Sequence, residues 1–418
     1  MKKNIFYFII KIIFIICFQI VFQVNTCHSK SLLLGAKTHS PSKFILLNGV
    51  AATPEAFQEI VSVFGNTSGR KTAVGVGFII SYLAVLPEEA ATQLRKYLDL
   101  SAKFDLPIIV QLDGEQWWQN RPDLWNWWDK NKPGYNPENK KNVEWTDWTS
   151  DSAVKIGWRN WGRQLRVGPM PNLMSPLYRK ACHIEMKKLV SIVMNWWQLL
   201  PKDKKYLLVG IKVGWESAIG VNNWYYPNGN DLLGQPEKND PKYGLKVDSL
   251  PGRGVKAIGY AAVSTLGLSA SGKLTEKELT EVVRLHLKDL SKACADLGVP
   301  RERLFTHCGG WSHLETLHSA ALNSYSCPGW SFYKYAYDPQ KETTTMKALK
   351  QSNAPYWGAV EWLYDEKAKE GNTEKAWASA LKKTLAITKI KYLCIYNWGG
   401  IKNNHSAIEA IRSISGNS

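Results

Sequence analysis

Two glutamates each follow a short apolar run, where a charged side chain is costly unless it has a use. Glu216 follows Tyr206–Trp215, and Glu361 follows Tyr356–Val360. Because the aromatic ring of Trp215 would shield Glu216 from water, this position suits a general acid. A second carboxylate facing the first can attack an anomeric carbon or activate a water molecule. Such a facing pair is what cleavage of a glycosidic bond requires.

The pair leaves two stereochemical routes open. Carboxyl groups about 5–5.5 Å apart favour a retaining displacement, whereas a separation of about 6.5–9.5 Å leaves room for the water of an inverting one. A sequence does not contain this distance. The structural alternative is that either glutamate forms an ion pair with a lysine or arginine of the same fold.

Further acids and tryptophans follow a third apolar run, which ends at Asp113. We predict that Asp113 and Glu115 bind sugar hydroxyls, since carboxylates accept strong hydrogen bonds, and that Trp117 and Trp118 face the same ligand. Either acid could instead replace a member of the catalytic pair. These acids lack the regular spacing of a calcium loop, and the chain contains no CxxC or HExxH motif. Neither a metal nor a cofactor is therefore predicted.

Other candidate binding residues lie near the ends of later apolar runs. His307 is followed by Gly309 and Gly310, and we predict that it contacts the substrate. Trp330 and Tyr333, like Trp215, offer aromatic faces that suit the C–H face of a sugar. Packing in the core is the alternative for each of them.

Eight short apolar runs, bounded by proline, glycine or charged residues, are typical of buried strands. Helix-period segments separate several of them, for example Pro87–Phe104, Leu177–Leu200, Thr275–Leu297 and Thr373–Lys389. The predicted strands are Phe44–Val50, Val74–Ser81, Pro107–Asp113, Tyr206–Gly214, Leu304–Cys308, Ser326–Phe332, Tyr356–Trp362 and Tyr392–Trp398. Eight strands alternating with helices predict an α/β fold, the (β/α)8 or TIM barrel.

Two intervals between the predicted strands are too long to be simple connections. They are Gly114–Pro176 after the third strand and Ser217–Lys273 after the fourth. Loops that follow barrel strands lie at the face where active sites are built, so both insertions are predicted to cover the site. The first insertion is rich in tryptophan, and we expect some of these indoles to face a ligand and the others to pack the insertion.

The position of the two glutamates resembles clan A of the retaining glycoside hydrolases, whose acid/base and nucleophile follow barrel strands four and seven. The resemblance implies that Glu216 is the acid/base and Glu361 the nucleophile. Trp398, in the segment Ile395-Tyr-Asn-Trp-Gly-Gly400, matches the tryptophan that lies under the sugar in that clan.

One position departs from the clan, because Trp215 stands where an asparagine usually precedes the acid/base. The hydrogen bond to the sugar 2-hydroxyl would then come from Asn222, Asn223 or Asn397. The run Glu216–Pro227 also resembles β-amylases, which are inverting barrels, so inversion stays an alternative.

The first residues, 1–30, read as a secretory signal, with Lys2 and Lys3 before an apolar stretch. Cys27 stands where a lipoprotein would be acylated, so membrane contact is expected only through such an anchor. We predict a secreted, periplasmic or cell-surface protein whose residues 31–418 form one barrel domain. The five later cysteines, an odd and scattered set, argue against a disulfide framework.

Charge and composition restrict the partners. The chain has 418 residues, 44% of them hydrophobic, and a formal charge of +17, which excludes a disordered chain. The basic residues are dispersed rather than gathered in a stripe, so no nucleic acid is expected. We predict an oligo- or polysaccharide substrate and an exported glycoside hydrolase. The alternatives are an inactive carbohydrate-binding barrel at the cell surface and, less favoured, a lyase acting on uronates.

Overall fold

The structure of the chain is a computed structural model. It describes residues 40–66, 69–115, 117–160, 164–219, 223–224, 256–309, 317–364 and 371–416. The predicted leader, with Cys27, lies outside these ranges. Within them, no helix combines the length and the apolar character needed to cross a membrane. Contacts along the chain gather Ser40–Ser418 into one unit.

Eight parallel strands close into a barrel and confirm the predicted fold class. In ring order they follow the sequence, and the last pairs with the first. They are β1 (Lys43–Asn48), β2 (Thr72–Ser81), β3 (Ile108–Asp113), β6 (Leu208–Ser217), β8 (Leu304–Cys308), β9 (Gly329–Phe332), β10 (Trp357–Trp362) and β11 (Ile390–Ile395).

The strands are apolar on both faces because each separates two buried layers. On β1, Phe44 and Leu46 belong to a small cluster inside the barrel, whereas Ile45 and Leu47 belong to the larger core between strands and helices. The same alternation along the other strands fills the barrel with side chains. Because the interior is filled, a site can form only at an end of the barrel, and in this fold that is where the strands have their carboxyl ends.

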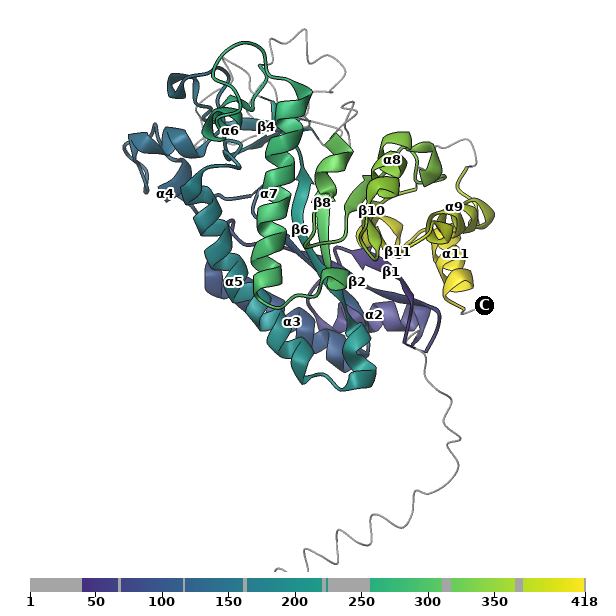
Figure 1. The fold of residues 1–418 in the computed structure, drawn as a ribbon. Coiled ribbons are helices and arrows are strands. Elements are labelled where there is room, and N and C mark those ends of the chain that lie inside the picture. Colours follow the sequence, from purple (N-terminus) through teal and green to yellow (C-terminus); the bar gives the residue numbers. More distant parts are fainter. Residues whose placement is uncertain are drawn as a thin grey trace, which may run out of the picture. The chain divides into compact units, whose positions relative to one another are not determined.

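Helices cover the outside of the barrel, and α3, α5 and α7 lie side by side there (Figure 1). Several begin at a residue whose side chain caps the helix, among them Thr53, Ser175 and Thr275. The longer helices are α2 (Pro54–Phe64), α3 (Pro87–Phe104), α5 (Pro176–Leu199), α7 (Glu276–Asp296), α8 (Thr343–Gln351), α9 (Glu374–Ala386) and α11 (His405–Ser415).

The two long insertions follow β3 and β6, as predicted. In the first lie α4 (Pro122–Trp125), β4 (Gly157–Asn160) and β5 (Gln164–Val167), and in the second β7 (Asn223–Trp224) and α6 (Tyr260–Thr265). β4 pairs with both β5 and β7, so one small antiparallel sheet joins the insertions. Figure 1 shows α4, α6 and β4 together at one end of the barrel.

Short helical turns complete the described chain. A four-residue helix, α10 (Trp398–Ile401), follows β11. The 3-10 turns are η1 (Pro137–Asn142), η2 (Ser150–Ser152), η3 (Lys202–Leu207), η7 (Arg301–Arg303), η8 (Leu317–Ala321) and η9 (Pro339–Lys341).

Candidate active site

A cavity of about 530 Å³ opens among the carboxyl ends of the barrel strands. Residues at or just beyond the ends of β2, β3, β6, β9, β10 and β11 line it. They are Ile79, Ser81, Asp113, Trp117, Trp215, Glu216, Tyr333, Glu361, Leu363 and Tyr396. The cavity thus contains both predicted catalytic glutamates together with Asp113, Trp117 and Trp215.

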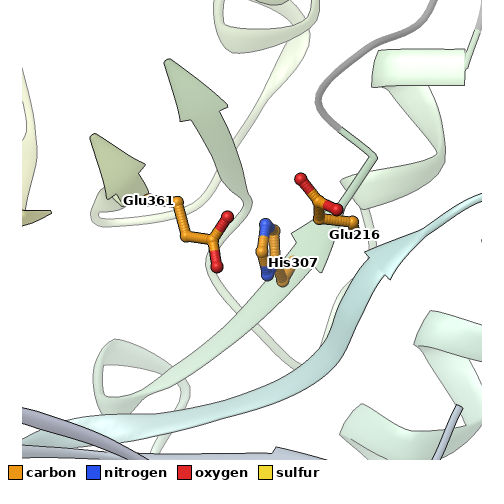
Figure 2. Close-up of side chains that lie close together, drawn as sticks. All are labelled: Glu216, His307 and Glu361. Atoms are coloured by element: carbon orange, nitrogen blue, oxygen red, sulfur yellow. The ribbon is translucent and has the colours of Figure 1, made fainter. Parts of the chain in front are cut away.

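Glu216 and Glu361 face each other across this cavity, with the imidazole of His307 between them in the view of Figure 2. The two glutamates are only 3% and 2% exposed. One side-chain ligand atom from each of Glu216, His307 and Glu361 lies within 4.8 Å of the other two. The structure therefore brings together three residues from β6, β8 and β10 that are far apart in the sequence.

An irregular end of β6 directs Glu216 into the cavity. The pairing of β6 with β8 shifts register between Val213 and Ser217, and a bulge of this kind bends a strand and re-aims its side chains. Gly214 has φ 78° and Glu216 has φ 45°. The left-handed region is common for glycine but rare for glutamate, so the surrounding contacts must hold Glu216 there.

Glu115 supports this turn from behind rather than lining the cavity. Its Oε1 accepts a hydrogen bond from Ser217 Oγ at 2.6 Å and contacts Nε2 of His286, on α7, at 2.9 Å. The backbone N–H of Glu115 donates to Asp113 Oδ1 at 2.9 Å. Glu115 therefore fixes Ser217, the neighbour of Glu216. It is not among the residues found to line the cavity, whereas Asp113, the other predicted sugar-binding acid, is.

Glu361 accepts hydrogen bonds on one oxygen. Tyr333 Oη donates to Oε2, and Ser331 Oγ lies 3.5 Å from the same atom. Oε1 has no hydrogen-bond partner within the described part of the chain. Burial raises the pKa of Glu361 above its usual value, and the charge of Glu216 adds to this rise, while Lys212, Tyr333 and Ser331 oppose it.

Lys212 and Ser331 belong to the site, although sequence reasoning did not single them out. The ammonium of Lys212 lies 2.8 Å from His307 Nδ1, and His307 Nε2 lies 2.8 Å from Ser331 Oγ. The available signal was a lysine in the middle of an otherwise apolar strand. His307 itself is fully buried in β8.

Glu216, His307 and Glu361 also form the kind of cluster that can hold a metal ion. Both imidazole nitrogens of His307 are already engaged, by Lys212 and Ser331. A second positive charge beside the Lys212 ammonium would be repelled. This donor set therefore fits a metal poorly.

Two of the predicted tryptophan contacts, Trp118 and Trp330, lie away from the cavity. Trp118 donates to the carbonyl of Pro169 and packs against Tyr178. Trp330 is fully buried and donates to the carbonyl of His318. These two indoles serve the core, because both rings are buried and their N–H groups donate to backbone carbonyls.

Trp398 requires a correction of position. β11 ends at Ile395, and Asn397 caps α10 by accepting a hydrogen bond from Gly400 N–H at 2.8 Å. The chain turns there, so the Trp398 ring packs against Phe64 and donates to Glu59. Tyr396 lines the cavity instead. Asn222 lies outside the described residues.

Comparison of the sequence with protein-family models finds no match, and comparison with curated proteins finds none either. In fold, the chain is similar to solved structures of known enzymes. A glycoside hydrolase family 5 enzyme from Prevotella bryantii B14 shares 9% identity with it, at a TM-score of 0.41 over 93% of this chain and 100% of the other.

The catalytic domain of a β-amylase from Paenibacillus polymyxa shares 9% identity at a TM-score of 0.48, over 91% of this chain and 100% of the other. A β-mannanase from Thermomonospora fusca, solved with mannohexaose, shares 10% at a TM-score of 0.34, over 88% and 82%. Similarity at these identities concerns the fold alone.

Proposed function

We propose that this chain is a glycoside hydrolase that cleaves glycosidic bonds with Glu216 and Glu361. The observation that carries the proposal is the pair itself: two buried carboxylates with oxygens within 4.8 Å of each other in one cavity. Oxygens this close favour a displacement in which one carboxylate attacks the sugar, for which about 5–5.5 Å between the carboxyl groups is typical, over an inverting route, which needs about 6.5–9.5 Å.

The hydrogen bonds around the pair support different roles for its members. Tyr333 donates to Glu361, and the Lys212 ammonium opposes the rise in the Glu361 pKa that burial causes. Both favour the ionised form that a nucleophile needs, so we assign this role to Glu361. Glu216, which follows Trp215 on β6 and lines the same cavity, acts as the acid. Asp113 accepts sugar hydroxyls, and Trp117, Trp215 and Tyr396 offer aromatic faces to the ring.

The reaction then takes two steps. In the first, Glu361 attacks the anomeric carbon while Glu216 protonates the departing oxygen, which leaves an ester between sugar and Glu361. In the second, Glu216 removes a proton from water, the water oxygen attacks the same carbon, and Glu361 leaves as a carboxylate. Both glutamates return to their starting states, and the anomeric configuration is retained.

The test uses purified protein and a panel of aryl glycosides. We expect Glu361→Ala and Glu216→Gln each to lower kcat by about 10³-fold or more while leaving the fold intact by circular dichroism. Azide should restore turnover of Glu361→Ala and yield a glycosyl azide, because a small anion can occupy the space of the missing carboxylate. Glu185→Gln is the matched control, since Glu185 is a buried glutamate on α5 paired with Lys188.

Near-normal turnover in either variant would refute the role of that glutamate. Proton NMR of the first product decides the stereochemistry, and a product of inverted configuration would favour the inverting alternative. Binding of oligosaccharides by calorimetry without any hydrolysis would instead favour a carbohydrate-binding barrel. We also propose that the protein is exported through residues 1–30, which detection of the mature N-terminus by mass spectrometry would test.

A further inference from the structure

Lys212 is a charged side chain within the wall of the barrel. It lies on β6, four residues before Glu216, and is 0% exposed. Its ammonium nitrogen is 3.6 Å from the centroid of the Trp215 ring. Removing an ammonium from water is strongly disfavoured unless neighbouring groups compensate. The groups that compensate for burial of this ammonium therefore indicate the role of Lys212.

The hydrogen bonds of Lys212 run in one direction. An ammonium has three donors and no acceptor, so Lys212 donates to His307 Nδ1 and the imidazole proton must reside on Nε2. Nε2–H then donates to Ser331 Oγ, 2.8 Å away. The hydroxyl proton of Ser331 is left to point at Glu361 Oε2, at 3.5 Å. A relay of donors therefore ends on the candidate nucleophile.

The charges around Lys212 agree with this direction. Burial lowers the pKa of Lys212 to about 8, while the carboxylates, Glu361 first, oppose that shift. The ammonium form of Lys212 and the ionised form of Glu361 therefore favour each other. Several titratable or charged groups face Glu361 from the surrounding strands: Lys212 and Glu216 from β6, His307 from β8, Tyr333 after β9, and Cys394 and Tyr396 from β11 and its end.

We propose that Lys212 is a positioning residue of the active site, which acts through His307 and Ser331 to keep the Glu361 carboxylate charged and oriented. Lys212 is not among the residues found to line the cavity, so we assign it a role through its neighbours rather than on the substrate. The effect of Lys212 on the rate of hydrolysis rests on the hydrolase function proposed above. The hydrogen bonds that join Lys212, His307, Ser331 and Glu361 do not depend on that function.

The kinetic test is Lys212→Met, which keeps most of the stem and removes the charge. Two carboxylates this close lose their protons in two steps that belong to the pair. Loss of a nearby positive charge makes both steps harder. Both limbs of the pH profile of kcat/KM should therefore move up by about 1–3 pH units, with kcat falling more than KM changes.

Two further variants separate this role from simple loss of packing. Lys391→Met is the matched control, because Lys391 is also a largely buried barrel lysine whose pKa burial lowers to about 8, yet it lies against Phe44 and Tyr356, away from the site. Its profile should match the wild type. Ser331→Ala breaks the relay without removing a charge, and it should move both limbs in the same direction by a smaller amount.

Nitrogen NMR of the full chain with labelled histidines tests the relay without any activity. His307, assigned with a His307→Asn variant, should show the tautomer with its proton on Nε2 in the wild type, and a changed tautomer in Lys212→Met. If the wild type hydrolyses no glycoside, the proposed function fails while this readout still applies. The inference is overturned by a proton on Nδ1 in the wild type, or by unshifted profiles in both Lys212→Met and Ser331→Ala.

Discussion

The hydroxyl of Tyr333 makes the closest contact with the candidate nucleophile. It donates to Glu361 Oε2, and burial together with the charge of Glu361 keeps the pKa of Tyr333 well above its usual value, so the phenol remains a donor at every working pH. A hydrogen bond to a charged group contributes about 1.5–3 kcal/mol. Tyr333 is therefore expected to stabilise the ionised form of Glu361.

Tyr333→Phe removes this donor and keeps the ring. We expect kcat/KM to fall by about 10–100-fold, which is that hydrogen-bond energy expressed as a rate, with both limbs of the pH profile moving to higher pH. The measurement is steady-state kinetics on an aryl glycoside between pH 4 and 10. Tyr335→Phe is the control, because Tyr335 packs beside Tyr337 outside the cavity. An unchanged rate in Tyr333→Phe would remove the hydroxyl from the mechanism.

Glu216 shows what single residues reveal before a structure is known and what they do not. Its position after an apolar run marked it as a candidate, as it did Glu361. Its φ of 45° could not be foreseen, because it depends on the register shift between β6 and β8, which is a contact between distant segments. Lys212 and Ser331 were missed for a related reason: a run that is apolar on both faces does not show which positions point to the inside of the barrel.

At the level of elements, the end of β6 is held by a buried cluster contributed by three parts of the fold. Glu115 follows β3, Ser217 ends β6 and His286 lies on α7, and both Ser217 and His286 contact Glu115 Oε1. A non-glycine residue in the left-handed region costs about 1–3 kcal/mol. By fixing Ser217, this cluster helps to keep the backbone of the adjacent Glu216 in its left-handed conformation.

Ser217→Ala removes one of these contacts. We expect the free energy of unfolding to fall by about 1–3 kcal/mol, as for a buried hydrogen bond to a charged group, and kcat to fall because Glu216 loses its fixed direction. Urea unfolding and kinetics measure the two effects. Ser291→Ala is the control, since Ser291 Oγ makes a buried bond to Ser326 Oγ at 3.1 Å, away from the cavity, and it should lose stability alone. Full activity in Ser217→Ala would contradict the positioning role.

The elements that sequence reasoning predicted well are the eight strands and the longer helices, because continuous apolar runs and capped, periodic segments are local properties. The end of β11 was predicted three residues too far along, and this displaced Trp398. The cause is the capping hydrogen bond of Asn397, which starts a helix and gives the cavity Tyr396 in its place. Trp118 and Trp330 were assigned to the site because composition alone does not separate an indole in the core from one that faces a ligand.

At the scale of the whole molecule, charge is distributed unevenly. The sequence carries a formal charge of +17, yet the ionisable residues found to line the cavity are three carboxylates and two phenols. The ionised carboxyls among Asp113, Glu216 and Glu361 would repel a uronate at this point. We therefore propose a neutral sugar as the substrate rather than the acidic one expected for a uronate lyase.

An ion pair between neighbouring helices links the outer layer of the fold. Asp289 on α7 pairs with Arg179 and His183 of α5. Burial would raise the pKa of Asp289, but hydrogen bonds from His183 and Arg179 outweigh it and hold the pKa well below its usual value. A carboxyl with a depressed pKa stabilises the fold above its unfolded pKa of about 4 and loses that contribution as the pH falls further.

Asp289→Asn should therefore lower the free energy of unfolding at pH 7 by about 1–2 kcal/mol. The difference in the free energy of unfolding between Asp289→Asn and the wild type should become smaller as the pH falls below about 4. Urea titrations at several pH values measure this difference. Glu138→Gln is the control, because Glu138 and Lys141 form an exposed pair that should leave the midpoint unchanged. A difference in the free energy of unfolding that stays constant down to pH 2 would contradict a lowered pKa of Asp289 in the folded protein.

The pairing of β1 with β11 has a consequence for biogenesis. During synthesis, Lys43–Asn48 leaves the ribosome more than three hundred residues before Ile390–Ile395. Until that last strand emerges, the growing sheet has two open edges, and open edges attract other chains. A nascent chain of this kind is open to association with other chains until its two ends meet, and truncation before residue 390 should yield aggregates rather than a smaller folded protein.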